Sequence, residues 1–109
     1  MLSKDEILRK ADQKIESVDV PEWGGQVYVR TLSGDERDRM EVQLKDSRVG
    51  SRGLFAALTI CDENGNRLFA DQDAHALGKK NAAALDRILE VGFRLNAMTE
   101  EAIEELEKN

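Results

Sequence analysis

The segment on which the rest of the fold depends reads Cys61-Asp62-Glu63-Asn64-Gly65-Asn66-Arg67-Leu68-Phe69-Ala70-Asp71. It follows the apolar run Leu54–Cys61 and precedes the amphipathic segment Asn81–Leu95. Its Asn64-Gly65 pair is the commonest signal for a short turn. The side-chain oxygens of Asp71 are placed to accept hydrogen bonds from the free backbone N–H groups at the start of another helix. We therefore predict that two helices, joined by this segment, bury a shared core in the most apolar part of the sequence.

The spacing of apolar residues predicts the first of these helices. Leu54, Leu58 and Cys61 recur at i, i+4 and i+7, which favours a helix over a buried strand. After the turn, a short helix is predicted over Asp71–Leu77. Gly78 is expected to end that helix in a left-handed conformation, which glycine adopts readily.

The second core helix is predicted to be the longest in the chain. Asn81 is its expected N-cap, because an asparagine side chain accepts a backbone N–H at a helix start. Its apolar face consists of Leu85, Ile88, Leu89, Gly92 and Leu95. On the opposite face, Glu90 and Arg94 are four residues apart and are expected to pair.

The N-terminal part of the chain is predicted to form a short helix and a β-hairpin. Ser3-Lys4-Asp5-Glu6 is a capping-box pattern, which predicts a helix over about Lys4–Ala11. Two runs with strand-like alternation follow within about residues 14–32, separated by Pro21 and by Trp23-Gly24-Gly25. The two glycines permit the positive φ values that a tight hairpin connection requires.

A second capping box, Ser33-Gly34-Asp35-Glu36, predicts a helix that continues to about Lys45. Met40 and Leu44 form its only clear apolar pair, so this helix is expected to contact the domain by a narrow seam. The next segment, Ser47–Gly53, contains two glycines and two serines, which is typical of a mobile connection.

The predicted class is an α+β fold that is predominantly α-helical: a small helical domain with an N-terminal β-hairpin. Thr99 is expected to cap a last, acidic helix at residues 99–108. A chain of 109 residues has the size of one domain. The domain is therefore expected to span residues 1–109, with the hairpin at about 14–32 and the helical core at about 54–95.

Composition excludes several classes of protein. The 22 acidic and 16 basic side chains give a formal charge of -6, which argues against a general binder of nucleic acid. Cys61 is the only cysteine and lies in an apolar run, so neither an intrachain disulfide nor a thiolate metal cluster is expected. No apolar run reaches the roughly 20 residues that span a bilayer. The polar start, Met1–Glu6, lacks a signal-peptide core, so we expect a cytoplasmic protein.

Neither catalysis nor metal binding is predicted. Asp62, Asn64 and Asn66 are spaced like the first ligands of a calcium-binding EF-hand loop, but its sixth position is Arg67 and its twelfth is Asp73. The EF-hand requires glycine and glutamate there, so a turn is the better interpretation. No phosphate loop, dinucleotide fingerprint or metal-ligand cluster is present. We expect a non-enzymatic protein without cofactors.

Four segments, in this order, resemble the tail assembly chaperones of long-tailed bacteriophages and prophages. They are Pro21-Glu22-Trp23-Gly24-Gly25, Leu32-Ser33-Gly34-Asp35-Glu36-Arg37-Asp38, Asp62-Glu63-Asn64-Gly65-Asn66-Arg67-Leu68-Phe69 and Leu95-Asn96-Ala97-Met98-Thr99-Glu100-Glu101. The resemblance covers nearly the whole chain. It implies a protein that binds and solubilises the tape measure protein, helps recruit tail tube (major tail) subunits, and is absent from the mature virion. It also implies a location in the cytoplasm of the bacterial host.

The residues that contact a partner are predicted from side-chain type alone. The candidates are Trp23, Tyr28, Arg48 and Arg52, chosen for exposed aromatic or basic character. For Trp23, a role in covering one side of the core is the main alternative. Proteins of this kind are often also made in a longer form by a -1 ribosomal frameshift. Codons for Glu107-Lys108-Asn109 can contain a slippery heptamer, which is the hypothesis for such a form here.

Two other functions remain open from the sequence. One is a virion structural protein, such as a tail completion or head–tail connector subunit, which would stay in the particle. The other is a regulatory nucleic-acid binder that uses Arg48 and Arg52, which the acidic charge disfavours.

Overall fold

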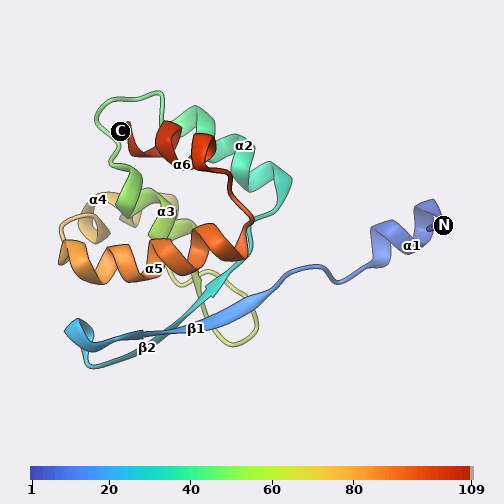
Figure 1. Ribbon diagram of the computed structural model, residues 1–109, viewed down its shortest axis with the longest axis horizontal. Coiled ribbons are helices and arrows are strands. Elements are labelled where there is room, and N and C mark those ends of the chain that lie inside the picture. Colours follow the sequence, from blue (N-terminus) through green and yellow to red (C-terminus); the bar gives the residue numbers. More distant parts are fainter. Residues whose placement is uncertain (109) are drawn as a thin grey trace.

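The computed structural model describes residues 1–108, which form a predominantly helical fold with one antiparallel sheet (Figure 1). This confirms the predicted class, α+β with an N-terminal β-hairpin. The elements in chain order are α1 (Lys4–Arg9), β1 (Ile15–Val20), η1 (Pro21–Trp23), β2 (Gly25–Arg30), α2 (Gly34–Gln43), α3 (Ser51–Thr59), β3 (Ile60–Cys61), η2 (Asp71–Asp73), α4 (Ala74–Leu77), α5 (Ala82–Leu95) and α6 (Glu100–Glu107).

The hairpin pairs β1 with β2 in antiparallel register, from Ile15 opposite Arg30 to Val20 opposite Gly25. Its connection is the single 3-10 turn η1, and Gly24 then reverses the chain with a φ of 73°. Of the two glycines expected to supply positive φ, Gly24 alone does so, because η1 already makes most of the turn. The hairpin therefore lies inside the predicted range of residues 14–32.

A third strand, β3, was not predicted. Ile60 and Cys61 pair with Val29 and Tyr28 of β2, which gives the strand order β1-β2-β3. The prediction that Cys61 continues the helix from Leu54 is therefore wrong, since α3 ends at Thr59. The open edge of β2 offers backbone partners that the i, i+4, i+7 spacing does not reveal.

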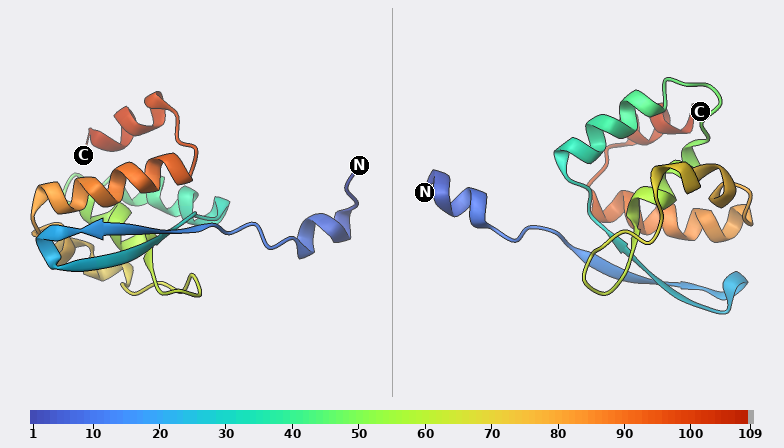
Figure 2. Two further views of the ribbon diagram at one scale, coloured as in Figure 1. Left: turned by 60° about the horizontal axis from the view of Figure 1, so that its bottom comes forward. Right: turned by 180° about the vertical axis from the view of Figure 1, so that it is seen from behind.

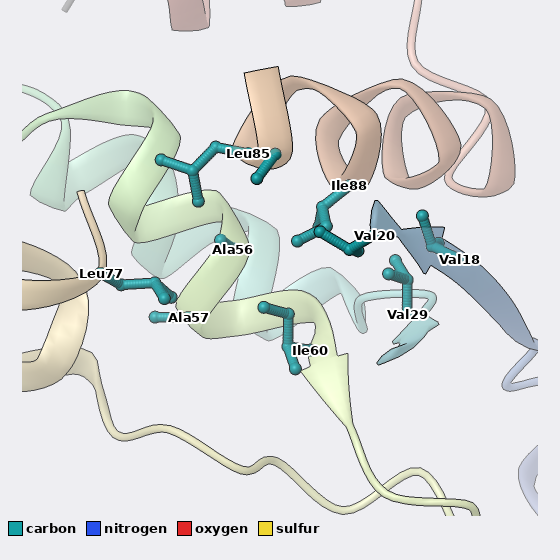
Figure 3. Close-up of a cluster of buried hydrophobic side chains, with 10 residues drawn as sticks. Val18, Val20, Val29, Ala56, Ala57, Ile60, Leu77, Leu85 and Ile88 are labelled. Carbon is teal, nitrogen blue, oxygen red and sulfur yellow. The ribbon is translucent and has the colours of Figure 1, made fainter. Parts of the chain in front are cut away.

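Helix α3 is the centre of the molecule, with every residue from Gly53 to Thr59 buried. An apolar cluster lies between α3, α4, α5 and the hairpin (Figure 3): Val18, Val20, Val29, Ala56, Ala57, Ile60, Leu77, Ala84, Leu85 and Ile88. A second cluster consists of Met40, Leu54, Phe55, Leu58, Leu89 and Leu106. A helix that contributes to two clusters is apolar on all sides, which explains why its sequence shows a run rather than a stripe.

Close helix packing assigns two glycines roles that the sequence did not indicate. Gly53 was predicted to lie in a mobile connection, but α3 begins at Ser51 and Gly53 contacts α4. A Cβ atom at Gly53 would lie 2.2 Å from the Ala74 carbonyl oxygen and 2.9 Å from the Gly78 Cα. Gly78 itself has a φ of -63°, so the predicted left-handed cap is also wrong. Both glycines instead let two helix backbones approach closely.

Asp71 does not cap the helix that follows it. Ala70 occupies the N-cap position of η2, and its N–H donates to Asp73 Oδ2 at 2.8 Å. Asp71 instead accepts a hydrogen bond from Gln43 Nε2 at 2.8 Å and lies 2.7 Å from Arg67 Nη1. The pKa of Asp71 is lowered, first by the hydrogen bond from Gln43 and then by Arg67. Tertiary contacts with α2 therefore override the local capping preference.

The ends of several helices also differ from the predictions. Helix α1 ends at Arg9 rather than Ala11, and α2 ends at Gln43 rather than Lys45. Helix α6 ends at Glu107, one residue before the predicted end. Asn109, the last residue of the predicted frameshift site, lies outside the described residues. The N-caps Ser3, Ser33, Asn81 and Thr99 are all confirmed. The assignment of residues 1–109 to one domain stays a prediction.

Arg94 pairs with Glu16 of β1, so the predicted partner, Glu90, is wrong. Helix α5 packs along the hairpin, which brings a carboxylate from a residue far away in sequence to the guanidinium group. Arg87 forms a similar link to Glu22 at 3.0 Å, beside the hairpin tip. Two exposed ion pairs thus join α5 to the hairpin.

Leu89→Ala is expected to lower the free energy of unfolding by about 2–3 kcal/mol, at the lower end of the usual range for a buried leucine. Leu89 is 6% exposed and belongs to the second cluster, at the edge of the pocket that it lines with Phe93. Urea unfolding followed by circular dichroism measures this loss. Glu90→Ala, at the exposed neighbouring position, should change stability by less than about 0.5 kcal/mol. An equal effect of the two changes would contradict the central position of Leu89.

Candidate partner-binding surfaces

A groove of about 490 Å³ lies between α2 and α6. In Figure 1 the two helices lie at the end of the molecule opposite the hairpin, and both contribute residues to the groove. The apolar lining consists of Met40, Leu44, Met98, Ala102 and Leu106, and the charged rim consists of Arg37, Glu41, Lys45 and Glu105. Met40 and Leu44 from the α2 side and Ala102 and Leu106 from α6 are two apolar pairs, each four residues apart, that line the groove.

The C-terminal end of α5 positions the α6 wall of this groove. Asn96 Oδ1 accepts the Leu32 N–H at 2.7 Å, and Asn96 Nδ2 donates to the Gly92 carbonyl at 2.8 Å. Ala97 has a φ of 50° and turns the chain away from α5. Asn96 was not among the predicted functional residues, although an asparagine just after a long apolar helix is a recognisable helix-end signal.

A second apolar surface is the N-terminal helix α1, which projects from the body of the molecule (Figures 1 and 2). Ile7 and Leu8 are 57% and 73% exposed, and no residue of α1 is buried. The linker is anchored where the Lys14 N–H donates to Thr31 Oγ1 at 2.9 Å. A helix of six residues gains little stability from its own hydrogen bonds, so an apolar contact would stabilise it further.

The two predicted aromatic contact residues lie on the hairpin. Trp23 is half-buried and packs against the first cluster, where it lines a pocket with Phe69 and Leu77. This position supports its role as a cover of the core. Tyr28 on β2 is 42% exposed.

The two predicted basic contact residues are already paired with carboxylates. Arg48 lies 2.9 Å from Asp46, and this guanidinium group lowers the pKa of Asp46 to about 2. Arg52 lies 2.8 Å from Asp86 of α5. Trp23, Arg48 and Arg52 each line a different pocket, so the structure does not gather them into one surface. A partner-binding role for the four predicted residues stays a prediction.

The segment that resembles an EF-hand is held as a turn by its own backbone. Asp62 Oδ1 accepts the N–H groups of Asn64 at 2.8 Å and Asn66 at 3.0 Å, and these bonds lower the pKa of Asp62. Burial raises the pKa of the Cys61 thiol, so its reactive thiolate form is disfavoured. Within residues 1–108, no three His, Cys, Asp or Glu side chains gather to hold a metal ion.

None of the described helices combines the length and the apolar character needed to cross a membrane.

An open groove with apolar lining residues and a projecting helix with exposed apolar side chains are surfaces of the kind that bind other proteins. The sequence matches the family described as phage tail assembly chaperone over residues 5–109, and the chain belongs to that family. It therefore has a role in the assembly of phage tails.

One solved structure similar to this chain is the "Structure of bacteriophage HK97 tail assembly chaperone", with a TM-score of 0.62. The two are 19% identical, over 84% of this chain and 86% of the other. At this level of identity, the likeness concerns the fold. No curated protein is similar enough in sequence to count as a relative of this chain.

Proposed function

We propose that this protein is a non-enzymatic chaperone that binds and solubilises the tape measure protein and helps recruit tail tube subunits around it. The observation that carries the proposal is the family match over residues 5–109. The accessible apolar surfaces support it, because a protein that shields a long helical partner needs exposed apolar area of its own. The net charge of -6 keeps such a protein soluble while it holds an aggregation-prone partner.

The pairing of the two candidate basic residues with carboxylates argues against the rival function as a nucleic-acid binder. Its two candidate residues, Arg48 and Arg52, face Asp46 and Asp86 rather than an open basic surface. A binder of the phosphate backbone needs guanidinium groups that are available to replace counterions.

We also propose that the protein acts in the cytoplasm of the bacterial host and leaves before the virion is complete. Mass spectrometry of purified virions tests this against the rival function as a tail completion or connector subunit. A chaperone should be missing from the particle. Detection of this chain at a stoichiometry like that of other minor tail proteins would favour the structural function instead.

Co-expression with the tape measure protein encoded with this chain is the direct test. We expect the tape measure protein to be insoluble alone and largely soluble when this chain is present, because the chaperone covers its apolar surface. The amount of soluble tape measure protein and its co-purification with this chain are the measurements.

If the tape measure protein stays insoluble, either the short chain is insufficient without a frameshifted extension or this protein is not a chaperone. Repeating the co-expression with the longer form separates these two explanations. If a frameshifted longer form is made, it supplies an extension that the short chain lacks. Solubility restored by that form would keep the chaperone function and show that the extension is needed. Insolubility with both forms would contradict the proposal.

A further inference from the structure

We propose that the groove between α2 and α6 holds an amphipathic helix of the tape measure protein. The apolar stripe of that helix would lie on Met40, Leu44, Met98, Ala102 and Leu106. A row of acidic, basic and acidic residues on that helix would lie opposite Arg37, Glu41 and Lys45 at the α2 edge of the groove. This inference rests on the proposed chaperone function and assigns it to a surface.

The shape and lining of the groove suit a helix. Along α2 the lining extends from Arg37 to Leu44 at the C-cap, which corresponds to about 10 Å at 1.5 Å per residue, or about two helical turns. Met40 and Met98 contribute flexible, polarisable side chains, which adapt to irregular apolar partners. Two helices that line one groove with apolar side chains accept a third helix by the same packing that builds helical bundles.

The charges on the α2 edge specify the partner. Arg37 and Glu41 are four residues apart on α2, and Lys45 lies in the turn just after the helix. All three line the groove beside the apolar pair Met40 and Leu44. Within residues 1–108, none of the three forms an ion pair, and Arg37 makes only a long contact of 3.4 Å to the Asn96 carbonyl. The complementary row on a partner helix is acidic, basic and acidic, as in the charged flanks of coiled coils.

On the α6 edge, Glu105 is the rim charge, and Lys108 lies 3.1 Å from it. This edge is therefore already neutralised locally. The α2 edge, rather than α6, carries the charges that select and align the partner helix.

Leu44→Glu tests the apolar floor, and Val42→Glu is its matched control. Both positions lie near the end of α2, but Val42 is 64% exposed and points away from the groove lining. Co-purification and binding titration with the tape measure protein are the readouts. We expect Leu44→Glu to weaken binding by at least roughly tenfold, the effect of losing a central apolar contact. Val42→Glu should bind like the unmodified chain.

Glu41→Lys tests the charge row, with Asp38→Lys as its control. The two changes alter the net charge equally on the same helix, and Asp38 does not line the groove. We expect Glu41→Lys to weaken binding by about two- to fivefold at low salt, and Asp38→Lys to leave binding unchanged.

Folding of each variant is checked by circular dichroism and thermal unfolding. If Leu44→Glu does not fold, Ala102→Glu on α6 tests the opposite wall. Groove variants that bind as well as the unmodified chain would overturn this inference while the chaperone function stands. An unmodified chain that fails to bind or solubilise the tape measure protein, in its short and long forms, would overturn the proposed function itself.

Discussion

Replacing Arg30 with methionine is expected to lower the free energy of unfolding by about 3 kcal/mol, the lower end of the cost of leaving a buried charge without its partner, because the remaining Glu36 side chain is 16% exposed. Arg30 is 6% exposed at the end of β2. Its guanidinium group lies 2.5 Å from Glu36 Oε2 and donates to the Leu58 carbonyl at 2.8 and 3.1 Å. One side chain thus joins β2, the first turn of α2 and the last turn of α3.

Urea unfolding of Arg30→Met measures this loss. Arg39→Met is the control, because Arg39 is exposed on α2 and forms no ion pair within the described residues. We expect the control to change stability by less than about 0.5 kcal/mol. The double variant Arg30→Met/Glu36→Gln should recover part of the loss, because no unpaired charge is left and glutamine keeps the capping box. Equal losses for Arg30→Met and Arg39→Met would contradict the central role of the ion pair.

The same ion pair predicts a difference in pH dependence. Burial by itself raises the pKa of Glu36, but the Ser33 N–H and Arg30 outweigh burial, so the pKa is lowered overall. The pKa is then lower in the folded than in the unfolded chain, where it is about 4.3. The resulting stabilisation is present above that value and is lost as the pH falls through the folded pKa. Stability should therefore fall less steeply below about pH 4.3 in Arg30→Met than in the unmodified protein.

The second large effect is expected for Gly53→Ala, which should lower the free energy of unfolding by about 3 kcal/mol or more. The added Cβ would lie 2.2 Å from the Ala74 carbonyl oxygen and 2.9 Å from the backbone of Gly78. These are backbone atoms, so no side-chain rotation relieves the overlap. Helices α3 and α4 must separate, which opens the first cluster at Leu77 and Ala57.

This prediction reverses the sign that helix propensity alone would give. In an exposed helix, glycine to alanine stabilises by about 1 kcal/mol. Gly34→Ala in the first turn of α2 is the matched control, since no atom lies within 4 Å of a Cβ placed there. Thermal and urea unfolding should therefore show that Gly53→Ala is less stable than the unmodified protein. The same measurements should show that Gly34→Ala is more stable or unchanged. A stabilised Gly53→Ala would show that α3 and α4 pack less closely than described.

Local sequence signals predicted the elements of this fold well. The capping boxes at Ser3 and Ser33 and the N-caps Asn81 and Thr99 each lie where the sequence placed them. Such caps involve residues only two or three positions apart, so the sequence contains all of the information. The same is true of the hairpin, whose strands are joined within a few residues.

The errors arise where distant residues compete with local preferences. Cys61 leaves the predicted helix because β2 offers it strand partners. Asp71 leaves the predicted cap because Gln43 and Arg67 bind its carboxylate. Arg94 pairs with Glu16, which is 78 residues away, rather than with a neighbour on its own helix. Contacts of this kind depend on how the elements pack, which no local spacing encodes.

The candidate site shows the same division. The sequence by itself determined that α2 has a narrow apolar seam at Met40 and Leu44 and that the last helix is acidic. Only the tertiary structure decided that these two helices line one groove, because Ala97 turns the chain after α5 and Asn96 ties that turn to Leu32. A groove is a property of two surfaces, and their approach is set by packing between residues far apart in the chain.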